Sequence, residues 1–419
     1  MSRLIINGGR PLYGAAQAGG AKNSILPILA AAVINGGENI IHNCPDLKDV
    51  HSAAAILRHL GCQVEWQGDA IVVNSAGMNR WDIPDELMRE MRSSVIFLGP
   101  VLARCGQAQM TYPGGCELGP RPIDLHLRAL SQLGVEIQED GGRICCRCGK
   151  MQGRDIALAL PSVGATENIM LCAAACPGQT RIVNAAREPE IWDLQQFLRK
   201  AGVQVSGAGC RDIVIQGGAP VQRSVEHWVI PDRIESATYL CACAAAGGRV
   251  RVEHTKSAYF ASVTHLLAES GCQVETGEDW AEIQAPRRLK SPAPVRTAPY
   301  PGFPTDAQSP VMAALCLAQG STVFSENIFE NRYRHCAELA RMGADIRVEG
   351  RTAIVVGVER LRGAAVKATD LRGGAALAVA GLAAQGQTEI QDIEHIDRGY
   401  QRIEEAYAAL GADIRREDG

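Results

Sequence analysis

One pattern of apolar and polar positions recurs six times along the 419-residue chain. In each copy an apolar helical stretch ends in Leu-x-x-x-Gly or Tyr-x-x-x-Gly, and a short strand with alternating apolar positions follows. The six glycines stand 68 to 73 residues apart and are Gly61, Gly134, Gly202, Gly271, Gly343 and Gly411. A glycine just after a helix favours the left-handed backbone conformation that a Cβ opposes. The pattern therefore predicts six α/β units of similar size.

A spacing of about 70 residues leaves room for two helices and several strands in each unit, which is more than a solenoid repeat holds. The chain is also too long for one ordinary core. We therefore expect an α/β protein with two domains of three units each, divided between Gly202 and Gly271.

Composition and charge narrow the classes of function. The chain is 46% hydrophobic and 21% charged with a net charge of −4, so nothing in it attracts nucleic acid or an anionic membrane as a whole. The apolar run around residues 25–34 is too short to span a bilayer, and the amino terminus lacks the apolar core of a signal peptide. We expect a cytoplasmic protein that binds small anions through local Arg and Lys.

The 15 cysteines do not form a recognisable disulfide or metal framework. Their number is odd, and a reducing compartment disfavours disulfides. Cys172, Cys176, Cys241 and Cys243 lie in apolar, Ala-rich helical stretches, which predicts small core residues. The cluster at residues 145–148 lacks a second pair at zinc spacing, so we expect no metal there. We expect no organic cofactor either.

Basic residues stand at several glycine-rich turns and helix starts. Lys22 follows Gly19-Gly20-Ala21 ahead of an apolar helix, where a phosphate or carboxylate would fit, although the Walker A spacing is absent. Further arginines of this kind are Arg92, Arg332, Arg372 and Arg398. Two or three of them converging would clamp an anion through forked hydrogen bonds. Taken singly, each residue fits a solvated surface side chain better than an anion clamp.

Two proline-rich loops carry candidates for proton transfer. Cys116 lies in a loop of turn residues with Arg121 nearby, a setting that suits a reactive thiol better than a core cysteine. Asp306 follows Pro-Gly-Phe-Pro-Thr, where a rigid loop would present a general base. An N-cap of the helix at 307–317 is an equally good interpretation of Asp306.

Together these segments closely resemble the family of UDP-N-acetylglucosamine enolpyruvyl transferases. The resemblance covers essentially the whole chain, and its blocks lie at residues 20–23, 91–94, 113–122, 162–166, 186–190, 231–235, 303–306, 330–332 and 395–400. It implies two similar domains, each of three βαβ-rich units around a pseudo-threefold axis, formed by residues 22–230 and by residues 1–21 with 231–419. Departures from the family pattern occur at Gly19, Leu160 and Gly373.

The resemblance also implies a reaction and a site. The enolpyruvyl group of phosphoenolpyruvate would pass to the 3′-hydroxyl of UDP-N-acetylglucosamine with release of phosphate, the first committed step of peptidoglycan synthesis. Cys116 would protonate the methylene carbon, form a covalent adduct and react with fosfomycin, and Asp306 would accept the hydroxyl proton. The anion clamp and the other substrate contacts would be Lys22, Arg121, Arg398, Asn23, Arg92, Pro122, Ile123, Asp124, Leu125, Ser162, Val163, Gly164 and Ile328.

Two alternatives stay open at this point. The first is a 3-phosphoshikimate 1-carboxyvinyltransferase, which shares the fold and the chemistry but lacks the cysteine loop. The second is a non-catalytic paralogue that binds the nucleotide sugar. The sequence leaves the oligomeric state undetermined, and a monomer is the default expectation.

Overall fold

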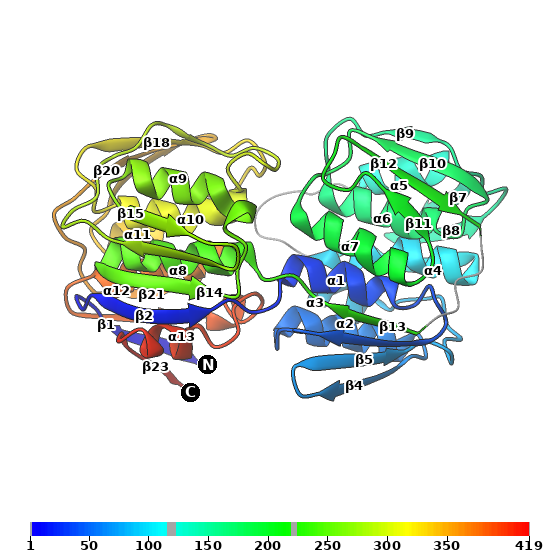
Figure 1. Ribbon diagram of the computed structural model, residues 1–419, viewed down its shortest axis with the longest axis horizontal. Coiled ribbons are helices and arrows are strands. Elements are labelled where there is room, and N and C mark those ends of the chain that lie inside the picture. Colours follow the sequence, from blue (N-terminus) through cyan, green and yellow to red (C-terminus); the bar gives the residue numbers. More distant parts are fainter. Residues whose placement is uncertain (1, 115–122, 219–223, 419) are drawn as a thin grey trace. The chain divides into compact units, whose positions relative to one another are not determined.

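The computed structural model describes residues 2–114, 123–218 and 224–418 (Figure 1). The described residues divide into two compact units. Unit 1 holds the residues up to Gly19 and those from Pro231 onward, and unit 2 holds those from Gly20 to Ile230. No helix in the described ranges combines the length and the apolar character needed to cross a membrane.

The six predicted glycines mark six equivalent places in the fold. Each has a φ between 92° and 98°, so the left-handed conformation expected after a helix is confirmed. The flanking pairs in unit 2 are α2 (Lys48–His59) and β4 (Gln63–Gln67), α5 (Asp124–Gln132) and β7 (Val135–Asp140), and α7 (Pro189–Lys200) and β11 (Gln204–Ser206). In unit 1 they are α9 (Ala261–Glu269) and β15 (Gln273–Thr276), α11 (His335–Arg341) and β19 (Asp345–Glu349), and α13 (Ile403–Ala409) and β23 (Asp413–Glu417).

Within the described ranges, these strands and the remaining ones form three sheets in each unit. In unit 2 the remaining strands are β3 (Glu38–His42), β5 (Ala70–Asn74), β6 (Gln107–Thr111), β8 (Arg143–Cys148), β9 (Asp155–Ala157), β10 (Gly178–Val183), β12 (Asp212–Gly217) and β13 (Val225–Trp228). In unit 1 they are β1 (Arg3–Asn7), β2 (Leu12–Gln17), β14 (Gly248–Glu253), β16 (Trp280–Gln284), β17 (Val295–Arg296), β18 (Ser321–Ser325), β20 (Thr352–Val356), β21 (Ala365–Lys367) and β22 (Gln387–Gln391).

All six sheets follow one plan. The strand after the glycine lies at one edge and pairs antiparallel with the next strand, as in the order β4-β5-β3-β13. At the opposite edge, the outermost strand runs parallel to its neighbour, as β2 does to β14. The sheet of β6 is the exception, because β6 has only an isolated parallel bridge there, between Asp82 and Gln109. In the sixth unit β23 pairs with β1, so the amino-terminal strand completes a sheet begun about 360 residues later.

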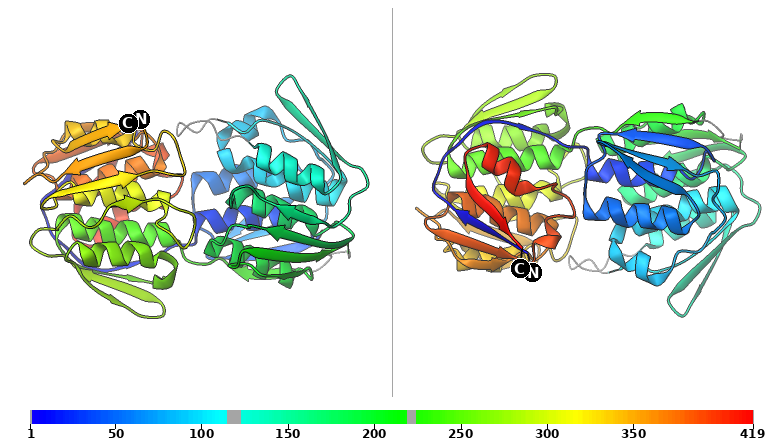
Figure 2. Two further views of the ribbon diagram at one scale, coloured as in Figure 1. Left: turned by 90° about the horizontal axis from the view of Figure 1, so that it is seen from above. Right: turned by 90° about the horizontal axis from the view of Figure 1, so that it is seen from below.

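Helices fill the inside of each unit, with the sheets around them (Figure 2). The inner helices of unit 1 are α8 (Arg233–Ala246), α10 (Thr305–Leu315) and α12 (Leu371–Ala383), and they pack against one another. Those of unit 2 are α1 (Lys22–Ala31), α4 (Leu98–Cys105) and α6 (Val163–Ala173), and the short helices are α3 (Asp85–Glu90), η1 (Arg92–Phe97), η2 (Ser257–Phe260) and η3 (Ile393–His395). Their small residues allow close packing, and the predicted core cysteines Cys172, Cys176, Cys241 and Cys243 are fully buried, as expected.

Candidate functional site

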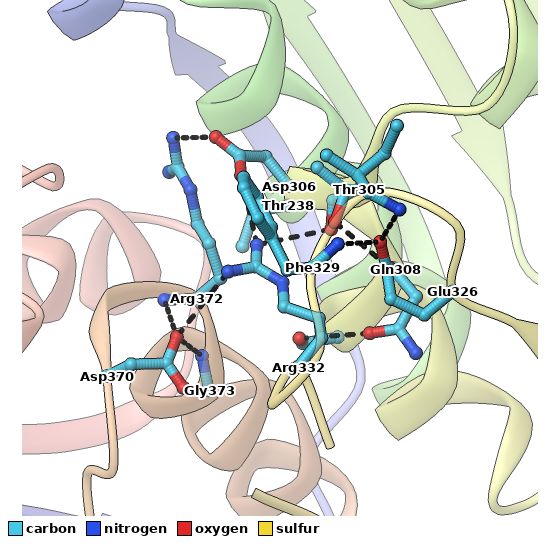
Figure 3. Close-up of polar contacts among 12 residues, drawn as sticks. Thr238, Thr305, Asp306, Gln308, Glu326, Phe329, Arg332, Asp370, Arg372 and Gly373 are labelled. Carbon is cyan, nitrogen blue, oxygen red and sulfur yellow. Dashed lines mark hydrogen bonds and ion pairs between the residues drawn. The ribbon is translucent and has the colours of Figure 1, made fainter. Parts of the chain in front are cut away.

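In unit 1 a cluster of charged side chains surrounds the start of α10. One carboxylate oxygen of Asp306 accepts a hydrogen bond from Arg332 at 3.0 Å, and the other accepts one from Arg372 at 3.2 Å (Figure 3). Both arginine side chains are only 2% exposed, whereas the Asp306 side chain is 27% exposed. α10 begins at Thr305 with Pro304 as the N-cap residue, so the capping interpretation of Asp306 is wrong.

The start of α12 fixes one of these arginines. Asp370 is the N-cap residue, and its carboxylate accepts the backbone N–H groups of Arg372 and Gly373, both at 3.1 Å. Burial opposes the charge of Arg372, but Tyr400 and the Asp306 carboxylate outweigh it and raise the pKa of the guanidinium above its ordinary value. Arg372 therefore stays charged while it orients Asp306.

Gly373 explains one departure from the family pattern. A Cβ at this position would lie 2.7 Å from the Asp370 carboxylate and 3.1 Å from His335. The glycine thus lets Asp370 close over the first turn of α12. An alanine here would need the capping carboxylate to move.

Glu326 organises the neighbouring loop. It is completely buried, and one of its oxygens accepts the backbone N–H groups of Ile328 at 2.8 Å and Phe329 at 3.0 Å. Its other oxygen accepts the hydroxyl of Thr305 at 3.0 Å, which joins the loop to the start of α10 (Figure 3). Through Glu326, these bonds join the backbone of Ile328, a residue that is 37% exposed, to the start of α10.

In unit 2 the start of α1 carries the cation that the sequence singled out. The Lys22 ammonium lies 2.8 Å from the carboxylate of Asp49, in the first turn of α2, and the two side chains are 9% and 2% exposed. A buried lysine with a deeper carboxylate partner has its charge stabilised and its position fixed. Asn23 follows on the same turn and is half-buried.

A second helix start in unit 2 brings together two stretches expected to bind the nucleotide. Ser162 is the N-cap residue of α6, and its hydroxyl accepts the N–H of Ala165 at 3.3 Å. A Cβ on Gly164 would lie 2.9 Å from the ring of His126, so the glycine lets α6 lie against α5. Ile123, Asp124 and Leu125 form the turn directly before this histidine.

One hydrogen bond fixes the tautomer of His126. Its Nδ1 lies 2.8 Å from the side-chain amide of Asn168, whose oxygen accepts the N–H of Gly99 at 2.7 Å. Burial, followed by the charge of Arg92, lowers the pKa of His126 to about 4. The ring is therefore neutral at pH 7 and lies within the electrostatic reach of Arg92, at the start of η1.

The predicted residues thus fall into groups. Lys22 and Asn23 share one turn, as do Ser162, Val163 and Gly164. Thr305, next to Asp306, is joined through Glu326 to the backbone of Ile328. Arg398 is half-buried just after η3. Arg332 and Arg372, expected among the candidate anion clamps, instead bind Asp306. Cys116, Arg121 and Pro122 lie outside the described residues.

Sequence reasoning did not assign roles to Asp49, His126 or Glu326. His126 is two residues beyond Asp124, and this proximity could have drawn it into the site. The pairing of Asp49 with Lys22 and the bond from Thr305 to Glu326 carry no local signal, because each joins residues more than 20 positions apart. Within the described ranges, no group of three His, Cys, Asp or Glu side chains is placed to hold a metal ion.

Comparisons with known proteins agree on the family. A family model described as EPSP synthase (3-phosphoshikimate 1-carboxyvinyltransferase) matches residues 6–407. The chain is 49% identical over 416 residues to UDP-N-acetylglucosamine 1-carboxyvinyltransferase 2 of Caldanaerobacter subterraneus subsp. tengcongensis, covering 99% of this chain and 100% of that one. It is 45% identical over 418 residues to UDP-N-acetylglucosamine 1-carboxyvinyltransferase of Cellvibrio japonicus, covering 99% of each.

Solved structures extend the agreement to the fold. The enolpyruvyl transferase NikO from Streptomyces tendae matches with a TM-score of 0.89 at 26% identity, covering 100% of this chain and 99% of that one. EPSP synthase from Acinetobacter baumannii matches with a TM-score of 0.74 at 18% identity over 100% of both, which supports the fold alone. The predicted fold class is confirmed, and the chain belongs to the enolpyruvyl transferase family.

Proposed function

We propose that this protein transfers the enolpyruvyl group of phosphoenolpyruvate to the 3′-hydroxyl of UDP-N-acetylglucosamine and releases phosphate, a step of peptidoglycan synthesis. The observation that carries the proposal is the Asp306 carboxylate, which two buried arginines orient while its own side chain keeps 27% exposure. Full-length relatives at 43–49% identity that are named for this acceptor support the choice of substrates.

The reaction needs a base and an acid on opposite sides of a carbon–carbon double bond. The 3′-oxygen bonds to C2 of phosphoenolpyruvate and gives its proton to Asp306, while Cys116 gives a proton to C3, which becomes a methyl group. The bond between C2 and the phosphate oxygen then breaks, and phosphate leaves with the electron pair. C3 returns a proton to the thiolate left on Cys116, which restores the double bond. No redox step occurs, and atoms balance without a co-reactant.

The donor carries a phosphate and a carboxylate, and cations are its natural partners. We assign this binding to Lys22, Arg121 and Arg398, with Asn23 and Arg92 as further contacts. The pairing of Lys22 with Asp49 at 2.8 Å supports its part, since it holds the ammonium in place before substrate arrives. Such preorganisation avoids reorganising the site during the reaction.

The acceptor needs a surface for its uridine and diphosphate. We assign this surface to the turn of Ile123, Asp124 and Leu125 and to the start of α6 at Ser162, Val163 and Gly164, with Pro122 beside the first and Ile328 near the sugar. The contact of Gly164 with the ring of His126 supports the grouping of the two stretches. His126 is kept neutral by burial and by the charge of Arg92, so it adds no further positive charge beside this surface.

Phosphate release measured with phosphoenolpyruvate and one acceptor at a time tests the proposal. We expect release with UDP-N-acetylglucosamine and none with shikimate 3-phosphate. The opposite preference would identify a 3-phosphoshikimate 1-carboxyvinyltransferase. Tight binding of the nucleotide sugar without any phosphate release would instead identify a non-catalytic paralogue.

A further inference from the structure

A buried hydrogen-bond network in unit 2 lies behind the start of α1. Its centre is Asp193 on α7, which is 1% exposed. One of its carboxylate oxygens accepts the hydroxyl of Ser24 at 2.5 Å and the backbone N–H of Ile230 at 3.2 Å. The other oxygen lies 2.9 Å from Nε2 of His227, which is 3% exposed.

All three partners donate to this carboxylate, which is the arrangement that stabilises a buried negative charge. With Nε2 as the donor, Nδ1 of His227 has no hydrogen-bond partner in the part of the chain that the structure describes. The ring instead meets Phe197 edge-on, with centroids 5.7 Å apart. His227 therefore serves Asp193 through one nitrogen and packs with the rest of its ring.

The network joins two segments that are far apart in sequence. Ser24 lies in the first turn of α1, two residues after Lys22. Ile230 is the last residue of unit 2, and its carbonyl accepts the backbone N–H of Ala21 at 2.8 Å. One oxygen of Asp193 thus binds both Ser24 and Ile230, in the two segments that the bond from Ala21 to Ile230 joins.

The first turn of α1 depends on such contacts, because its own sequence provides few. Its N-cap residue is Ala21, which makes no side-chain capping bond, and the turn contains no acidic residue. Carboxylates from two other helices act on it instead: Asp49 of α2 binds Lys22, and Asp193 of α7 binds Ser24. Both helices pack against α1 (Figure 1).

We propose that Asp193 is a positioning residue that acts through Ser24 to hold Lys22 where it binds the anionic groups of phosphoenolpyruvate. The proposal rests on the function proposed above, in which Lys22 is part of the donor clamp. Loss of the Ser24 contact lets the first turn of α1 shift, and the shift weakens donor binding without removing any group that meets the substrate. His227 supports the charge and the orientation of Asp193.

Two matched serine variants test this role. Ser24→Ala removes the hydroxyl that binds Asp193, and Ser75→Ala removes an equally buried hydroxyl that bonds the carbonyl of Ala32, at the other end of α1, at 2.7 Å. We expect Ser24→Ala to raise the KM for phosphoenolpyruvate about tenfold. The KM for UDP-N-acetylglucosamine and kcat should stay within about twofold of the parent values, and Ser75→Ala should leave all three constants unchanged.

A second substitution checks the same role, and the activity of the parent protein separates failure of this role from failure of the proposed function. Asp193→Asn should raise the same KM in the same direction, since it replaces an acceptor of three bonds by a weaker one. An unchanged KM for phosphoenolpyruvate in Ser24→Ala, or an equal rise in Ser75→Ala, would overturn the positioning role. A parent protein that releases no phosphate with either acceptor would overturn the proposed function instead.

Discussion

The starts of α1 and α10 are built alike but with the charges reversed. At α1 a lysine, Lys22, is paired with the deeper carboxylate of Asp49, whose side chain is 2% exposed. At α10 a carboxylate, Asp306, is bound by the deeper guanidinium groups of Arg332 and Arg372, each 2% exposed. In both clusters the residue assigned to the substrate is the more exposed member, and its partners are buried supports.

This reversal matches two different tasks. A cation that is fixed in advance suits the binding of an anionic donor, which changes affinity. A carboxylate that is fixed in advance suits proton acceptance, which changes the rate of the chemical step. The two clusters should therefore give opposite kinetic signatures when they are altered.

Asp306→Ala should give the largest effect. Loss of a general base should lower kcat by about a thousandfold, while the affinity for phosphoenolpyruvate, measured by titration calorimetry, stays the same. Asp306→Asn is the companion variant, because its amide still accepts a bond from an arginine and limits the cost of removing a carboxylate from two buried cations. A normal kcat in both variants would remove Asp306 from the chemistry.

Lys22→Gln should show the opposite signature, a rise in the KM for phosphoenolpyruvate of about a hundredfold or more. The single variant also leaves Asp49 buried without its ammonium partner, which destabilises proteins by about 3–5 kcal/mol. The double variant Lys22→Gln/Asp49→Asn separates the two effects: we expect stability to recover and donor binding to stay weak. Recovery of donor binding would mean that Lys22 is structural.

A further buried carboxylate, Glu235, lies on α8, which packs against α10. Its carboxylate accepts the N–H of Gly19 at 2.8 Å and the hydroxyl of Tyr239 at 2.7 Å, and burial, reinforced by Asp232, raises its pKa to about 7. A raised pKa means that the folded protein disfavours the charged form. The stability linked to this group is complete below about pH 4.5 and is lost as pH rises to about 7.

Glu235→Gln should remove that part of the pH dependence. Chemical unfolding followed across pH 4.5–7 should show the variant gaining stability relative to the parent as pH rises, by at most about 3 kcal/mol. Parallel pH profiles for the two proteins would show that Glu235 binds its proton equally in the folded and unfolded states.

The repeated architecture could be predicted because its signal is local. A glycine after a helix and an alternating strand occupy about ten consecutive residues, so Gly61 and its five counterparts stand out in the sequence. The closure of the sixth sheet by β1 has no such signal. Strand pairing between residues as far apart as Asn7 and Gln387 depends on the tertiary fold, and only the family resemblance pointed to it.

The candidate site likewise has residues that the sequence reveals and residues that it does not. Asp306 could be singled out, but base and cap stayed equally good. The arginines that bind its carboxylate, Arg332 and Arg372, lie 26 and 66 positions away. Asp193 was not noticed at all, since neither Ser24 nor His227 is close to it in sequence. Spacing along a chain identifies reactive residues, whereas the buried groups that hold them come from distant elements.

The central claim is that phosphoenolpyruvate gains a proton at C3 from the protein and later loses one. The most direct test is to run the reaction in D₂O and measure deuterium in the product by mass spectrometry. An exchangeable donor such as Cys116 would deliver deuterium to C3, and rotation of the resulting methyl group would leave some of it in the product's methylene. We therefore predict deuterium in that methylene, and a product formed without any deuterium would contradict the mechanism.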